Sequence, residues 1–305
     1  KKIINMEDVL SWDKFFYETN KSKFYPPKKI DLYNRLVAFT DNFFVIAAIG
    51  AFTPGYLMIV TKKMLPSFCL IESSQIKELK WLINILEKEI SKYYNRNVVL
   101  FEHGMCACVG GLDRAHLHLM TIDKKADNSL LEKCVNRALV RRRAGITHVE
   151  FKGHKLENIH DIDQIMSSNK KNEYNIHGKQ LAYNDISKDL DIKNWPTSAI
   201  DHVKSGGHYV FFKTNSESSS FFTKKNFQTQ LGREIVFELE KETNSSFNKW
   251  VNDTLKINSY SNIWKWQEFP FNENILKTIK DFTEIASRIN DQNKEFGFTN
   301  IKPKK

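Results

Sequence analysis

Apolar residues occur in short, dense runs in several parts of the chain, and these runs predict β-strands. Residues 42–49 (NFFVIAAI) and 56–61 (YLMIVT) are separated by GAFTPG, whose glycines and proline are typical turn residues. Further apolar runs predict strands at 97–104, at 115–122 and, much later in the chain, at 208–214.

Other segments carry apolar residues at helical spacing. In residues 73–94, leucines and isoleucines recur every three or four positions with lysines and glutamates between them, which predicts an amphipathic helix capped by Ser73 or Ser74. Three more helices are predicted at 129–143, 226–240 and 272–289.

The order of these segments predicts an α+β fold in three parts. Residues 1–150 hold most of the predicted strands and the long helix, and form the first domain. Residues 151–200 are polar and weakly periodic, which indicates an insertion or linker. Residues 201–305 form a C-terminal α+β extension that we expect to pack on the first domain.

Composition narrows the class of protein. The chain has 305 residues and a net charge of +10, which favours acidic partners such as nucleotides and also allows a nucleic-acid partner. Lysine accounts for most of this charge in a chain rich in Asn, Lys and Ile, so charge alone is weak support for nucleic-acid binding.

Cysteine spacing and hydropathy bear on the compartment. The four cysteines (Cys69, Cys106, Cys108 and Cys134) have neither disulfide-framework nor zinc-site spacing. No apolar stretch is long enough to span a bilayer, and the first residues do not resemble a signal peptide. We therefore expect reduced thiols, no membrane partner and a cytoplasmic location.

The segment GGLDRAHLHLMTID (110–123) carries the most informative pattern. Strand alternation places His116 and His118 on one face, with leucines on the other. Gly110 and Gly111 precede them, and such a turn can present peptide N–H groups to an anion. One neutral imidazole can then attack phosphorus, while the second binds a phosphoryl oxygen or protonates the leaving group.

Two other interpretations of the histidines stay open. They can be partly buried side chains that neighbouring carbonyls satisfy. They can also bind a metal, although two histidines at i and i+2 need a third ligand that the sequence does not place. We expect no metal at these positions and no cofactor.

Together with PGYLMIVTKK, the helix after it and VVLFEHG, the segment DRAHLHLMTI resembles the histidine triad (HIT) superfamily of nucleotide hydrolases and nucleotidyltransferases, in particular its longer bacterial-type branch. The resemblance covers residues 40–125. A weaker one extends to QLGREI and WKWQEFPFNENILKTI in the C-terminal part. It implies a small antiparallel sheet with a long helix packed on it.

The resemblance assigns roles to the matching residues. His116 corresponds to the nucleophile that attacks the α-phosphate and is transiently nucleotidylated. His118 corresponds to the final histidine, which contacts the phosphate. Gly110 and Gly111 fall where family members offer backbone N–H groups to it. Glu102 falls at or beside a position often held by Asn, and the adjacent His103 is a further candidate for the phosphate site.

The chain also departs from the family pattern. Arg114 replaces the first histidine of the triad, Tyr56 stands where many members have another histidine, and Ala48 replaces an acid that binds ribose in some members. Arg114 lies two residues before His116 on the same strand face, and we expect its guanidinium to bind a substrate phosphate; if it instead points outward, the site has lost a supporting group.

These observations predict an enzyme that hydrolyses or transfers a nucleotidyl group through His116, with a nucleotide or dinucleotide as substrate. The alternatives are a catalytically impaired HIT-fold protein that binds nucleotides or RNA ends, and a subunit of a larger assembly. The oligomeric state is not predicted.

Overall fold

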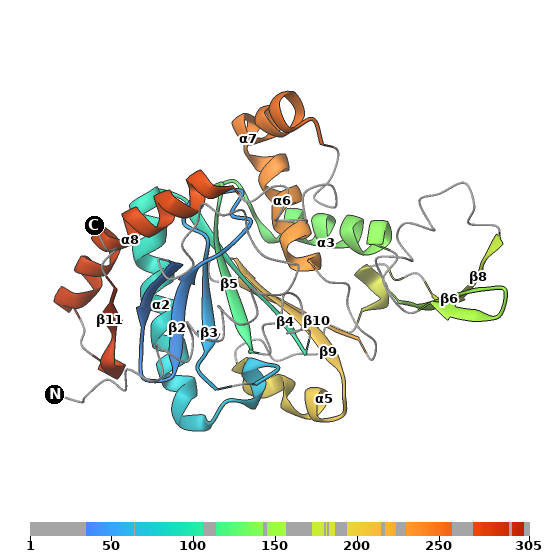
Figure 1. The fold of residues 1–305 in the computed structure, drawn as a ribbon, viewed down its shortest axis with the longest axis horizontal. Coiled ribbons are helices and arrows are strands. Elements are labelled where there is room, and N and C mark those ends of the chain that lie inside the picture. The colour runs from blue at the N-terminus through green and yellow to red at the C-terminus, as the bar shows by residue number, and fades with distance from the viewer. Residues whose placement is uncertain are drawn as a thin grey trace.

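The computed structural model describes residues 35–63, 65–105, 114–142, 145–156, 173–179, 181, 183–186, 194–214, 217–223, 230–257, 271–292 and 295–301. They form a large antiparallel sheet with helices packed on it and a small second sheet (Figure 1). This mixed architecture agrees with the predicted α+β class.

The main sheet has the strand order β10-β9-β4-β5-β3-β2-β1-β11, and every neighbouring pair is antiparallel. Its strands are β1 (Leu36–Phe39), β2 (Phe43–Ala47), β3 (Leu57–Thr61), β4 (Asn97–Gly104), β5 (His116–Ile122), β9 (His208–Thr214), β10 (Glu217–Thr223) and β11 (Thr299–Asn300). The strands predicted at 97–104 and 208–214 have the predicted bounds.

Strands from both sides of residue 201 share this sheet. β9 runs along β4, from the pair Val99↔Thr214 to the pair Gly104↔Tyr209. At the opposite edge β11 pairs with β1. The C-terminal part of the chain thus supplies strands at both ends of a sheet whose centre comes from the first 122 residues.

The helices are α2 (Ser73–Tyr94), α3 (Asn128–Arg142), α5 (Ile200–Lys204), α6 (Leu231–Thr243), α7 (Ser245–Trp250) and α8 (Asn272–Gln292), with 3-10 turns at Phe68–Leu70 (η2), Tyr183–Asp185 (η4), Thr197–Ala199 (η6) and Glu295–Gly297 (η9), and a π-helical turn at Val251–Leu255 (η7). Of the helix predicted at 226–240, residues 226–229 lie outside the described residues.

The long helix α2 has the bounds that its apolar spacing predicts. Its N-cap is Glu72, not Ser73 or Ser74, because Gln75 Oε1 accepts the Glu72 backbone N–H at 2.9 Å and the serines lie within the helix. The helix ends at Tyr94, and its C-cap residue Asn95 takes the left-handed conformation with φ of 53°.

Helices cover both faces of the main sheet. Glu87 of α2 forms an ion pair with Lys213, whose partner across the ladder is Leu100. On α6, Gly232 lies against the ring of Phe101. Because neighbouring residues of a strand point to opposite faces, α2 and α6 cover opposite sides of β4. Buried side chains from the sheet and these helices form one hydrophobic core.

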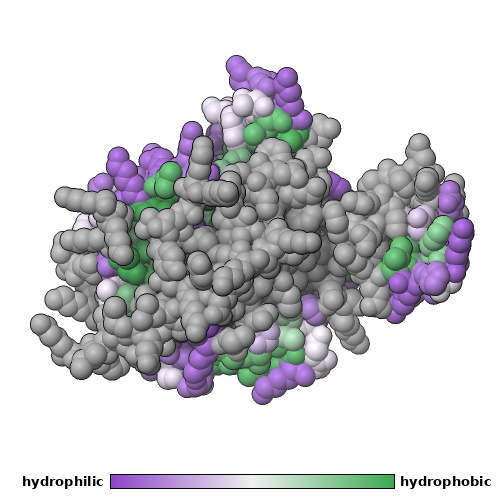
Figure 2. Space-filling view, viewed as in Figure 1, coloured by the Kyte–Doolittle hydropathy of each residue, from purple (hydrophilic) through white to green (hydrophobic). Residues whose placement is uncertain are grey.

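The small sheet has the order β7-β6-β8, with β6 at Ile146–Phe151, β7 at His154–Leu156 and β8 at Asn175–Gly178. It stands at the right of the molecule in Figure 1. Figure 2 shows mostly hydrophilic described residues at its outer edge, around a few hydrophobic ones. Part of the predicted polar insertion therefore folds as a sheet.

None of the helices among the described residues has the length and apolar character needed to cross a membrane. Cys69 and Cys134 are buried free thiols, and Cys106 and Cys108 lie outside the described residues.

Candidate functional site

His116 and His118 lie side by side on one face of β5, at the centre of the main sheet. Their ring centroids are 4.9 Å apart, with the rings nearly perpendicular. His118 is buried, with 8% of its surface exposed, whereas His116 is partly exposed. The strand alternation predicted for this segment is confirmed, and His116 is the more accessible of the two.

The His116 ring is held by its own strand. Its Nδ1 lies 3.0 Å from the backbone carbonyl oxygen of Arg114. A carbonyl only accepts, so Nδ1 carries the proton and donates it, and Nε2 of the neutral ring carries a lone pair. Burial, together with the charge of Arg233, lowers the pKa of His116, although the bond to Arg114 opposes this shift. His116 is therefore a neutral imidazole with an unprotonated Nε2.

His118 is held from two sides. Its ring stacks on Phe101 of β4, with centroids 4.3 Å apart and planes within 10° of parallel. Its Nδ1 lies 2.5 Å from the Tyr56 hydroxyl oxygen. Burial, reinforced by the neighbouring His116 and Arg233, holds the pKa of His118 well below its ordinary value.

Arg233, near the start of α6, binds the same Tyr56 hydroxyl group. Its Nε donates to the Tyr56 hydroxyl oxygen at 2.7 Å, and its Nη2 donates to the Ile49 carbonyl at 2.6 Å. With the Arg233 hydrogen on its oxygen, the Tyr56 hydroxyl group can donate its own hydrogen to Nδ1 of His118. In that arrangement the His118 proton is on Nε2, which is the opposite tautomer to that of His116.

The close approach of α6 to the sheet depends on Gly232. A Cβ atom there would come within 2.3 Å of the Phe101 ring. The glycine thus lets the next residue, Arg233, reach Tyr56. Sequence reasoning assigned Arg233 no role. The signal was an arginine at the start of an apolar helix (LGREIVF), but 177 residues separate Arg233 from Tyr56.

His103 lies on the same face as the two histidines. Phe101 of β4 pairs with His118, so His103, two residues further along β4, points the same way. Burial, together with the nearby His208 and His116, lowers the pKa of His103 to about 3. The structure thus brings His103, His116 and His118 together as neutral side chains.

Glu102 lies on the opposite face of the sheet. It pairs with Leu117, and its carboxylate accepts the Phe68 backbone N–H at 2.8 Å and the hydroxyl hydrogen of Tyr209. Burial raises the pKa of Glu102 to about 7, although these hydrogen bonds and one from Ser67 oppose the shift. The sheet itself separates this carboxyl group from the histidines, so the two are not brought together.

The side chain of Arg114 turns toward the end of β3. Its Nη1 donates to the Thr61 carbonyl at 3.3 Å and also to the Lys62 carbonyl. Arg114 is buried, with 7% of its surface exposed. These bonds hold the residue that precedes β5 by two positions against the end of β3. The backbone carbonyl of this same residue, Arg114, binds the His116 ring.

Gly110 and Gly111, the predicted phosphate-binding turn, lie outside the described residues, which resume at Arg114. Their role stays a prediction. The adjoining end of β4 turns at Met105, which has a positive φ of 69°.

A cleft of about 700 Å³ lies elsewhere. Its lining includes Phe52, Glu240, Trp250 and Phe271, at the end of α6 remote from Arg233. None of the sequence-predicted site residues that the structure describes lines this cleft.

The chain matches no known family model, and no curated protein matches it significantly. The histidine site is therefore defined by its own geometry.

Proposed function

We propose that this protein is a HIT-like nucleotide hydrolase or nucleotidyltransferase that acts at the α-phosphate through a covalent intermediate on His116. The observation that carries the proposal is the bond from His116 Nδ1–H to the Arg114 carbonyl. It supports a neutral ring with an unprotonated Nε2, on the more exposed histidine of the pair.

The proposed reaction has two steps. The Nε2 lone pair of His116 attacks the α-phosphorus, a P–N bond forms, and the bond from phosphorus to the leaving group breaks. The positive charge on the nucleotidylated ring is stabilised by the Arg114 carbonyl that accepts from Nδ1. Water, or an acceptor hydroxyl group, then attacks phosphorus, breaks the P–N bond and restores neutral His116.

His118 is suited to contact the substrate phosphate. With Tyr56 bound to Nδ1, the Nε2–H of His118 is a donor for a phosphoryl oxygen or for the departing group. Stacking on Phe101 limits ring rotation, which keeps this donor oriented.

Arg233 supplies fixed positive charge close to both histidines, and it lowers the pKa of each. In the family that the sequence resembles, a further histidine often occupies the Tyr56 position. Here the Tyr56–Arg233 pair takes that place beside His118. We propose that this pair replaces the supporting function of the missing histidines.

A phosphate contact by Arg114 would be additional to its two backbone bonds. These bonds favour a second candidate function: if they are the whole role of Arg114, the site has lost a supporting group and the protein binds nucleotides or RNA ends without turnover. The net charge of +10 suits either ligand.

Turnover of a panel of nucleotides tests whether the protein is an enzyme or binds its ligand without turnover. The panel contains an adenosine phosphoramidate, nucleoside di- and triphosphates, and a dinucleoside polyphosphate. We expect His116→Ala to abolish release of the nucleoside monophosphate, and His118→Ala to slow it while binding stays measurable. His154→Ala, on β7 and away from the site, is the matched control. Full turnover in His116→Ala would exclude the mechanism, whereas binding without turnover in the parent would favour the second function.

A further inference from the structure

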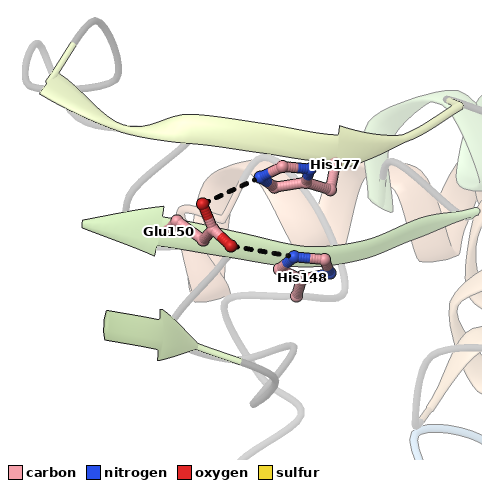
Figure 3. Close-up of side chains that lie close together, drawn as sticks. All are labelled: His148, Glu150 and His177. Atoms are coloured by element: carbon pink, nitrogen blue, oxygen red, sulfur yellow. Dashed lines mark ion pairs between the residues drawn. The ribbon is translucent and has the colours of Figure 1, made fainter. Parts of the chain in front are cut away.

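Three ligand-type side chains converge on the small sheet, away from the histidine site. His148 and Glu150 are on β6 and His177 is on β8, where it pairs directly with His148 (Figure 3). We call these residues the His–Glu–His cluster. Alternation places His148 and Glu150 on one face of β6, and the register adds His177 from the neighbouring strand.

The spacing of the cluster matches that of ligands around one ion. Nε2 of His148 and Nε2 of His177 lie 3.5 and 3.2 Å from the carboxylate oxygens of Glu150. One ligand atom from each of the three residues lies within 4.8 Å of the others. Two ligands about 2.1 Å from a tetrahedral ion are about 3.4 Å apart, so small side-chain adjustments suffice.

The chemistry of the three ligand groups indicates which kind of ion the cluster would bind. Two imidazoles and one carboxylate suit a divalent transition metal, whereas Mg²⁺ and Ca²⁺ prefer sites built from oxygen alone. The imidazole rings stack with centroids 4.2 Å apart and planes within 7° of parallel, so both present Nε2 to the same side. All three side chains are partly exposed.

A bound ion would stabilise the small sheet. Its strands β7 and β8 consist mainly of exposed residues, so little apolar burial holds them to β6. Val149, between His148 and Glu150, is fully buried on the other face. A metal bound on the exposed face would cross-link β6 and β8 where hydrophobic contacts are few.

We propose that the His–Glu–His cluster binds one divalent transition-metal ion, with Zn²⁺ as the best match to its ligands, and that the ion stabilises the pairing of β6 with β8. This site is independent of the proposed nucleotidyl chemistry, because its residues belong to a different sheet.

Calorimetric titration of the chelator-treated full chain with Zn²⁺ tests the binding. The parent is expected to bind one equivalent, and Co²⁺ in its place is expected to give the visible absorption of a nitrogen- and oxygen-ligated ion. His148→Ala and His177→Ala should each weaken Zn²⁺ binding by at least about a hundredfold. His154→Ala, on the same small sheet, and His116→Ala, in the histidine site, should keep the parent affinity.

Hydrogen exchange tests the role of the ion and does not depend on turnover. Zn²⁺ should slow amide exchange in residues 146–151 and 175–178 of the parent and of His154→Ala, and should have no such effect in Glu150→Gln. The proposal is overturned if the parent binds no Zn²⁺ or if His148→Ala and His177→Ala bind it like the parent. It is also overturned if Zn²⁺ does not change the rate of amide exchange in β6 and β8 of the parent.

Discussion

The hydroxyl oxygen of Tyr56 lies 2.5 Å from Nδ1 of His118 and accepts the Nε hydrogen of Arg233 at 2.7 Å. One phenol group therefore connects β5 to α6. We propose that it also holds His118 in the Nε2–H tautomer, whereas the Arg114 carbonyl holds His116 in the Nδ1–H tautomer. Opposite tautomers would suit the two roles that we propose, His116 as nucleophile and His118 as donor.

Tyr56→Phe tests this connection. The change leaves buried polar atoms of His118 and Arg233 without the phenol oxygen, so we expect the free energy of unfolding to fall by about 1–3 kcal/mol. The ¹⁵N shifts of His118 should lose their strong preference for the Nε2–H tautomer, while those of His116 should not change. Tyr174→Phe, at a partly exposed ring near the small sheet, is the control. Unchanged His118 tautomers and stability in Tyr56→Phe would contradict the proposed role of the Tyr56 hydroxyl group in orienting His118.

Glu102→Gln tests the buried carboxyl group on the other face. Burial raises the pKa of Glu102 to about 7 in the folded chain, above an ordinary value of 4.5. The folded state therefore holds its proton more tightly, and this contribution to stability is complete below about pH 4.5 and is lost as the pH rises through about 7. Glutamine cannot titrate, so between pH 5 and 8 the variant should gain about 3 kcal/mol in unfolding free energy relative to the parent.

Urea unfolding of the Glu102→Gln variant and the parent at pH 5, 6, 7 and 8 measures this difference. A constant difference at all four pH values would show that the carboxyl group titrates normally. Turnover should change little in the variant, because the sheet separates Glu102 from His116.

Much of the fold follows from local sequence pattern. The dense apolar runs at 97–104 and 208–214 became β4 and β9, and the long periodic segment at 73–94 became α2. The strands β1 and β11 are short, and β8 lies in a polar segment, so little in the sequence predicts them. The pairing of β1 with β11 joins residues more than 250 positions apart, which no local pattern encodes.

The sequence predicted the candidate site, like the fold, only in part. Alternation correctly placed His116 and His118 on one face, and the same rule shows why Glu102 and His103, adjacent in sequence, point to opposite faces. The contact between Tyr56 and Arg233 could not be predicted, because it needs the chain to return after 177 residues. The phosphate contact predicted for Arg114 stays a prediction, and its bonds to the Thr61 and Lys62 carbonyls were not foreseen, since a long side chain at a strand end can reach either its neighbours or a ligand.

Arg114→Ala separates its two roles. Loss of the bonds to the Thr61 and Lys62 carbonyls should lower the unfolding free energy by about 1–3 kcal/mol. If Arg114 also binds a substrate phosphate, as the sequence predicts, affinity for nucleoside triphosphates should fall by about 1.5–3 kcal/mol in calorimetric titrations, while a nucleoside phosphoramidate is affected less. Arg114→His should shift preference toward the less charged substrate. Equal affinities in all three proteins would limit Arg114 to its structural bonds.

Metal removal should leave the proposed chemistry intact. The His–Glu–His cluster lies on the small sheet, and the proposed reaction uses the Nε2 lone pair of His116 rather than a metal-bound water. Turnover of the chelator-treated protein should therefore equal that of the untreated protein, measured with chelator present throughout. Loss of turnover that Zn²⁺ restores in the parent, and equally in His148→Ala, would place a required metal at the histidine site.

Intact-mass spectrometry after brief exposure to each nucleotide of the panel tests the central claim most directly, because it detects the covalent intermediate itself. The account predicts an adduct with the mass of one nucleoside monophosphate less water, acid-labile as a phosphoramidate is, mapped by peptide fragmentation to His116. The adduct should be absent in His116→Ala and present in His154→Ala. An adduct on another residue, or turnover by the parent with no adduct at any quench time while His116→Ala stays active, would contradict the account.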